Sequence, residues 1–122
     1  MGMFRVKVKL ANPAAPRRTA GVSLLVDTGA TLSWVPRKII DGLGVAPEME
    51  ISFVLADGRE LVRPVGPVRM TIDGKSLSIP VAFSEEGEKP TLGVTALEVL
   101  GFTVDPIERK LVPRKHLALL RI

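Results

Sequence analysis

A series of short strand-like segments, separated by closely spaced turn signals, constrains the fold of this chain more than any other feature of its sequence. The first segment, residues 4–10, alternates apolar and cationic side chains, which places the apolar ones on one face of a strand. Asp57-Gly58 and Asp73-Gly74 lie between later strand-like segments and tolerate the positive φ angles that a type I′ hairpin turn requires at both central residues. The pattern predicts a meander of short antiparallel strands.

The remaining segments complete an all-β plan with one helix. We expect a loop over residues 12–18, where prolines interrupt strand pairing, and a helix over residues 94–100 that Gly101 caps. Residues 36–44 are expected to form only a helical turn. Further strands are expected at residues 20–26, 32–35, 50–55, 60–65, 68–72, 77–83, 102–104, 110–112 and 117–122. We predict one domain over residues 1–122, with a small closed β-barrel-like fold and one short helix near the C-terminus.

Composition argues against several kinds of site and partner. The chain has no cysteine, which excludes disulfides and thiolate ligands and fits a reducing, cytoplasmic location. His116 is the only histidine, so a zinc site or a Ser-His-Asp triad has almost no material. The net charge is +4, but the basic residues are scattered and aromatic residues are few. No apolar run approaches the length of a membrane span. We therefore expect no metal, cofactor, nucleic acid or membrane partner.

The carboxylate of Asp27 is the side chain that most needs a functional explanation. It directly follows the apolar run Leu24-Leu25-Val26, and an acidic group there is costly to bury unless it is hydrogen-bonded or paired. Thr28 offers a hydroxyl donor, and Gly29 lets a ligand approach the backbone closely. On this motif alone, a strand-ending turn and a functional site are about equally good interpretations.

Three motifs in order along the chain give the sequence a resemblance to the retropepsin-like aspartic peptidases, of the cellular or prokaryotic type. The motif around Asp27 is similar to the catalytic motif, the second to the flap hairpin, and the third to the second glycine motif with its helix. They are Val26-Asp27-Thr28-Gly29-Ala30, Leu55-Ala56-Asp57-Gly58-Arg59, and Thr91-Leu92-Gly93 followed by Leu97 and Leu100-Gly101-Phe102. The resemblance spans nearly the entire chain and implies an all-β acid-protease subunit.

The resemblance also implies roles for individual residues. Asp27 would be the catalytic residue, Thr28 would support the floor of the site across a dimer axis, and Gly29 would offer its backbone to substrate. The residues implied to contact substrate are Ala30, Ala56, Asp57, Gly58 and Thr91. The Asp57-Gly58 hairpin would close over an extended peptide. Trp34 is more suited to the core or a pocket wall than to catalysis.

The chemistry of an aspartic peptidase requires two carboxylates that share one proton. This chain has no second Asp-Thr-Gly or Asp-Ser-Gly motif, because Asp41, Asp57 and Asp73 each precede glycine directly. One chain therefore supplies half a site. We expect a two-fold symmetric homodimer that brings Asp27 against its own copy and hydrolyses peptide bonds.

Two positions differ from the viral members that the chain resembles. Those members commonly carry an Asp after the catalytic motif and an Arg after the second glycine, and the two form an ion pair that helps to fix the dimer. This chain has Thr31 and Val94 there. We hypothesise that the apolar segment at residues 117–122 provides a different dimer contact, by pairing with residues 4–10 or with its symmetry mate.

Two other functions stay open from the sequence. The same fold and dimer could serve as a catalytically silent module that binds or scaffolds peptides. An unrelated small β-barrel with a fortuitous Asp-Thr-Gly is the third interpretation, which the three ordered motifs disfavour.

Overall fold

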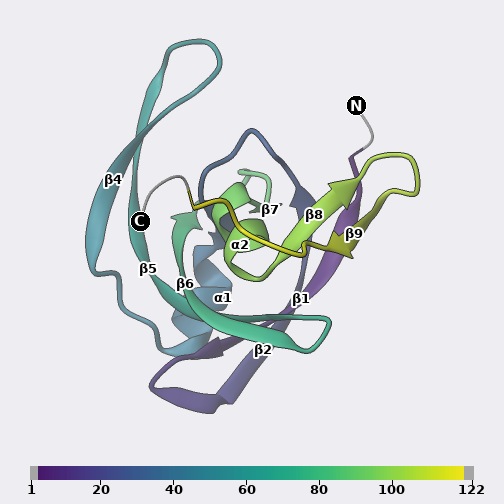
Figure 1. Ribbon diagram of the computed structural model, residues 1–122. Coiled ribbons are helices and arrows are strands. Elements are labelled where there is room, and N and C mark those ends of the chain that lie inside the picture. Colours follow the sequence, from purple (N-terminus) through teal and green to yellow (C-terminus); the bar gives the residue numbers. More distant parts are fainter. Residues whose placement is uncertain (1–2, 120–122) are drawn as a thin grey trace.

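The computed structural model describes residues 3–119, which form nine strands and two helices (Figure 1). The elements are β1 (Arg5–Asn12), β2 (Ala15–Val26), β3 (Ser33–Pro36), α1 (Arg37–Leu43), β4 (Met49–Val54), β5 (Glu60–Ile72), β6 (Lys75–Ser84), β7 (Thr91–Leu92), α2 (Val94–Val99), β8 (Phe102–Asp105) and β9 (Lys110–Pro113). The predicted all-β class and the helix near the C-terminus are confirmed.

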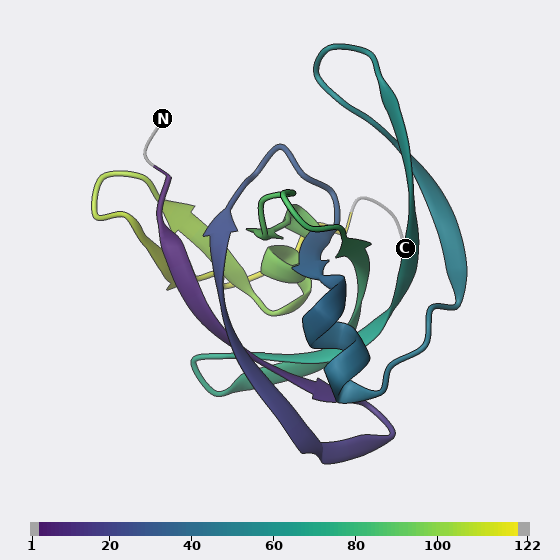
Figure 2. The same ribbon diagram turned by 180° about the vertical axis from the view of Figure 1, so that it is seen from behind.

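Seven of the strands pair in the order β1-β2-β7-β3-β6-β5-β4. An additional pairing of β1 with β5 closes the first six of them into a ring, and β4 extends the sheet outside it (Figure 2). β8 and β9 form a separate two-stranded sheet. The ring places the end of β2 beside β7, two elements that are far apart in the sequence.

Alternation along β1 produces the expected burial. Val8 and Leu10 are buried in the main core, whereas Lys7 and Lys9 are exposed. At the end of β2, Leu24, Leu25 and Val26 are all buried, because β1 and β7 flank this part of the strand. The apolar end of β2 therefore leads directly to Asp27.

The predicted loop over residues 12–18 is wrong. The chain turns at Pro13 and Ala14, and β2 already begins at Ala15. The pairing of β1 with β2 shifts register between Ala11 and Asn12. Pro16 lies within this irregularity, where its missing N–H interrupts no regular ladder bond.

The strands predicted at residues 60–65 and 68–72 are one strand, β5, which continues through Gly66 and Pro67. A side chain at Gly66 would lie 2.9 Å from the carbonyl oxygen of Ala46. Glycine is therefore needed where β5 passes close to the backbone at Ala46. The Gly-Pro pair therefore marks a close approach of two backbones, whereas the sequence predicted a break between two strands.

The segment at residues 36–44 forms a true helix, α1, so the prediction of a single helix is wrong. Ile40 and Leu43 are three residues apart and both are buried against the sheet. Gly44 ends the helix in the left-handed conformation at φ 77°. Gly101, at φ 78°, follows α2 as expected.

The two Asp-Gly turns differ. Asp73 and Gly74 have φ angles of 48° and 79°, which confirms a type I′ turn between β5 and β6. At the other turn only Gly58 has a positive φ, so the type I′ prediction is wrong there. The N–H of Gly58 donates to the carbonyl of Leu55 at 2.9 Å, which makes the tip one residue longer, with Gly58 alone in the left-handed region.

The strand predicted at residues 117–122 is not present over residues 117–119, and residues 120–122 lie outside the described residues. Leu117 and Leu119 are exposed. Within residues 3–119, no helix is both long enough and apolar enough to cross a membrane.

Candidate active site

Asp27 is held in place by hydrogen bonds from its own backbone and from the strand before it. Its N–H donates to the carbonyl of Leu92 at 3.0 Å. The N–H of Leu25 donates to Pro90 at 3.2 Å, and that of Val26 donates to Phe4 at 2.9 Å. With backbone partners on both sides, the end of β2 fixes the position of the carboxylate.

The turn after Asp27 orients its side chain. The N–H of Gly29 donates to Oδ1 of Asp27 at 2.9 Å, and the N–H of Ala30 donates to the Asp27 carbonyl at 3.2 Å. The hydrogen bond from Gly29 restricts the side chain of Asp27 to one orientation. Asp27 as a whole is partly buried.

The second glycine motif, around Gly93, holds the Asp27 turn through hydrogen bonds that its backbone N–H groups donate. The N–H of Gly93 donates to Oγ of Ser33 at 3.0 Å, and the N–H of Val94 donates to the carbonyl of Ala30 at 2.8 Å. A side chain at Gly93 would lie 2.6 Å from the carbonyl carbon and oxygen of Leu32. Only glycine permits this approach. The start of α2 and the Asp27 turn are therefore one interlocked unit.

A cleft of about 840 Å³ opens above Asp27. Its walls come from the Asp27 turn and β3, from the β4–β5 hairpin, and from the segment before β7. The lining residues are 27, 29–32, 34, 51–56, 61, 88, 89 and 91. Most of these side chains are apolar, which suits a groove that binds an extended chain with apolar side groups.

The β4–β5 hairpin forms one wall of the cleft and extends beyond the rest of the molecule (Figure 1). Phe53 of β4 contacts Trp34 of β3, with ring centroids 4.9 Å apart and ring planes at 60°. An edge-to-face contact of this kind stabilises the pair beyond its buried area. It joins the hairpin to the strand that follows the Asp27 turn.

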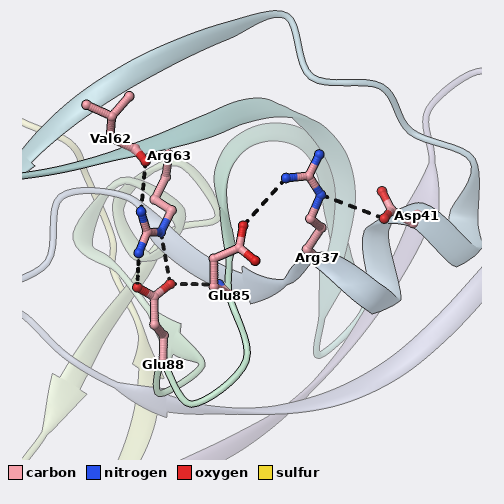
Figure 3. A network of polar contacts seen from close by, with 6 residues as sticks. All are labelled: Arg37, Asp41, Val62, Arg63, Glu85 and Glu88. Carbon is pink, nitrogen blue, oxygen red and sulfur yellow. Dashed lines mark hydrogen bonds and ion pairs between the residues drawn. The ribbon is translucent and has the colours of Figure 1, made fainter.

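An ion pair joins strand β5 of the same hairpin to the segment before β7 (Figure 3). Arg63 of β5 binds Glu88 through two nitrogens, and the side chains are only 18% and 21% exposed. Glu88 also accepts the N–H of Glu85 at 2.7 Å. The hydrogen bond from Arg63 lowers the pKa of Glu88 below its ordinary value, and Glu88 in turn raises the pKa of Arg63. The pair thus links the β4–β5 hairpin to the segment before β7, and these form two walls of the cleft.

We expect Arg63→Met and Glu88→Gln each to lower the free energy of unfolding by about 1–3 kcal/mol at pH 7, because each leaves a half-buried polar partner unsatisfied. The folded-state pKa of Glu88 is depressed, so the stabilisation is complete above the unfolded value of about 4.5 and is lost as pH falls through the lower folded value. Urea unfolding at several pH values measures this.

Arg59→Met is the matched control, because Arg59 pairs with Asp57 at the hairpin tip while both side chains are more than half exposed. Its unfolding free energy should match that of the parent chain. Equal losses from Arg59→Met and Arg63→Met would contradict a special role for the buried pair.

The structure places the predicted site residues in three groups. Asp27, Gly29, Ala30, Ala56 and Thr91 line the cleft together. Thr28 is exposed and lines a separate hollow of about 330 Å³ beside α2. The hairpin tip at residues 57–58 does not line the cleft.

Several cleft residues were not identified from the sequence. Phe53, Glu88 and Lys89 line the cleft without belonging to any of the three motifs. Alternation along β4 could have indicated Phe53, since Ile51 and Phe53 share a face and are half-buried. Nothing local to the sequence indicated Glu88 or Lys89, because their position depends on how their segment packs.

No group of three or more His, Cys, Asp or Glu side chains within residues 3–119 could hold a metal ion. The acidic residues that line the cleft are Asp27 and Glu88, and Glu88 is paired with Arg63. A single oriented carboxylate at the base of an open groove can accept or donate a proton, and a second one beside it would allow both at once.

Comparison with known proteins agrees with this arrangement. A family model described as aspartyl protease matches residues 6–104, which includes Asp27, the β4–β5 hairpin and the Gly93 motif. A search of curated proteins gave no match. The matched region covers most of the chain. The chain therefore belongs to the aspartyl protease family, among its retropepsin-like members.

Proposed function

We propose that the chain is an aspartic endopeptidase that acts as a symmetric homodimer. The observation that carries this proposal is the placement of Asp27, which is oriented by Gly29 and held from both sides at the base of a peptide-sized cleft. Each chain has one such motif. Because the reaction needs two carboxylates, the second Asp27 comes from a second copy.

The two Asp27 carboxyl groups would share one proton, since like charges a few Å apart do not both ionise. The ionised member removes a proton from a water molecule, whose oxygen attacks the carbonyl carbon of the peptide bond. The protonated member donates its proton to the carbonyl oxygen. The first carboxyl group, now protonated, then gives its proton to the amide nitrogen, while the second, now ionised, takes a proton from a hydroxyl group of the tetrahedral intermediate. The carbon–nitrogen bond breaks, and the carboxyl pair returns to its starting state.

The β4–β5 hairpin would serve as the lid over bound peptide. Its underside contributes Phe53, Leu55 and Ala56 to the cleft, and its tip carries Asp57 and Gly58. The contact between Phe53 and Trp34 and the Arg63–Glu88 pair hold the two strands of the hairpin, which leaves its tip at residues 56–58 as the part able to move.

The dimer contact would use exposed surface near the symmetry axis. Thr28 is exposed next to Asp27, outside the cleft. Exposed Leu117 and Leu119 are candidates for apolar contact with a second copy. The absence of cysteine is consistent with action in a cytoplasmic, reducing setting.

The purified chain, incubated with a diverse peptide library from acidic to neutral pH, should cleave within peptides and should sediment as a dimer. Cleavage by a strict monomer at high concentration would contradict the shared site. A chain that lacks residues 117–122 should dimerise more weakly, and an unchanged dimer would exclude that segment from the contact. If the library is bound but never cut, the silent binding module is the better description.

A further inference from the structure

We infer that Lys89 makes the cleft selective for peptides with an acidic side chain near the bond that is cut. The inference rests on the proposed function, because it names the substrate class of the same cleft. Asp27, Glu88 and Lys89 are the charged residues that line it. In the proposed reaction Asp27 performs the chemistry. Glu88 and Lys89 are therefore the charged side chains left to distinguish one peptide from another.

The negative charge of Glu88 is already compensated. Arg63 binds its carboxylate through two nitrogens and keeps the pKa of Glu88 low, so Glu88 stays ionised and paired. Nearby, Glu85 lies 3.5 Å from Arg37 and does not line the cleft, nor does Glu86. Because Glu88 is paired with Arg63 and neither Glu85 nor Glu86 lines the cleft, no carboxylate of this segment neutralises the charge of Lys89.

Lys89 makes no hydrogen bond or ion pair with any other residue in the range 3–119, and it is exposed. Its backbone is nonetheless well positioned. The carbonyl of Pro90 accepts the N–H of Leu25, and Thr91 pairs with both Leu25 and Trp34 in the sheet. The ammonium group therefore extends from a fixed point on the wall, and a peptide carboxylate is its natural partner.

Two-fold symmetry extends this preference to both sides of the cut bond. A second copy would place its own Lys89 on the opposite half of the joined cleft. The walls of each cleft are mostly apolar, and Trp34 and Phe53 contact each other there. The preferred peptide would thus combine apolar side chains with acidic ones. The net charge of +4 favours the approach of such peptides.

The test compares peptides that differ only in Glu, Gln or Lys at each position around a cleaved bond. In the parent chain, kcat/KM should favour Glu over Gln by about two- to fivefold at one or more positions, with Lys poorest. Raising the salt concentration should reduce the difference. Lys89→Met should bring the Glu to Gln ratio near one, and Lys89→Glu should favour the Lys peptide. Lys38→Met, on the exposed face of α1, should keep the parent ratio.

Binding of the same peptides to Asp27→Asn, followed by fluorescence anisotropy, separates selectivity from catalysis. The inference is supported if Asp27→Asn binds Glu peptides more tightly than Gln peptides and if the double variant Asp27→Asn, Lys89→Met does not. This holds even if the parent chain cuts no peptide. Equal binding and cleavage of the three peptides would overturn it while leaving the peptidase proposal intact. A Glu preference that survives Lys89→Met would also overturn it.

Discussion

Asp27→Asn should lower kcat/KM for peptide cleavage by at least about 10³-fold while leaving the fold unchanged. Asparagine does not ionise, so neither copy of the residue can take a proton from water or return one to the leaving nitrogen. The amide oxygen can still accept the N–H of Gly29, which binds Oδ1 of Asp27 at 2.9 Å, so the turn should persist. Circular dichroism and the urea midpoint check this.

Asp73→Asn is the matched control. Asp73 lies in the β5–β6 turn at φ 48°, a conformation that asparagine also tolerates, and it does not line the cleft. Its activity should equal that of the parent chain. Cleavage that persists in Asp27→Asn would refute the proposed mechanism.

Mixing parent and Asp27→Asn chains tests the shared site directly. If each active dimer needs both carboxylates, an equal mixture after subunit exchange should retain about one quarter of the parent activity. Two independent sites would retain about half, which would contradict a pair of Asp27 residues on one axis.

Gly93→Ala should produce the largest loss of stability of any substitution considered. The added carbon would lie 2.6 Å from both the carbonyl carbon and oxygen of Leu32, and 2.9 Å from the carbonyl oxygen of Ala30. These are backbone atoms, which do not yield as a flexible side chain does. We expect the free energy of unfolding to fall by about 3 kcal/mol, the upper part of the range for overpacking. Urea or thermal unfolding measures it.

The same substitution should also move the Asp27 turn. Gly93 and Val94 donate their N–H groups to Ser33 and Ala30, so separating the two segments breaks those bonds. Activity should fall even where the protein is still folded. Gly42→Ala is the control, because a side chain there meets nothing within 4 Å and its φ is ordinary. Gly42→Ala, within α1, should leave the free energy of unfolding unchanged or raise it by about 0.5–1 kcal/mol. Equal effects of the two substitutions would contradict the interlock.

Local patterns in the sequence were sufficient for part of the fold. Alternation along residues 4–10 set the buried face of β1, and Asp73-Gly74 set a type I′ turn. The motif at Asp27 gave the carboxylate and, by the lack of a second copy, the expectation of a dimer. The buried face and the turn depend on residues adjacent in the chain, where the period of a strand or the sterics of a turn decide the outcome. The expectation of a dimer came from the whole sequence and from the need for two carboxylates.

Only the tertiary structure decided the features that join distant segments. Two strands were predicted on either side of Gly66 and Pro67, but β5 continues through both residues, and Gly66 lets it pass close to Ala46. The walls of the cleft depend on Trp34 meeting Phe53 and on Arg63 meeting Glu88, contacts that no local pattern encodes. Asp27 was visible in the sequence, whereas its orientation and the exposure of Lys89 in the cleft wall were not. The physical reason is that side-chain packing and paired charges depend on which strands become neighbours, and the closed pairing of the sheet determines that.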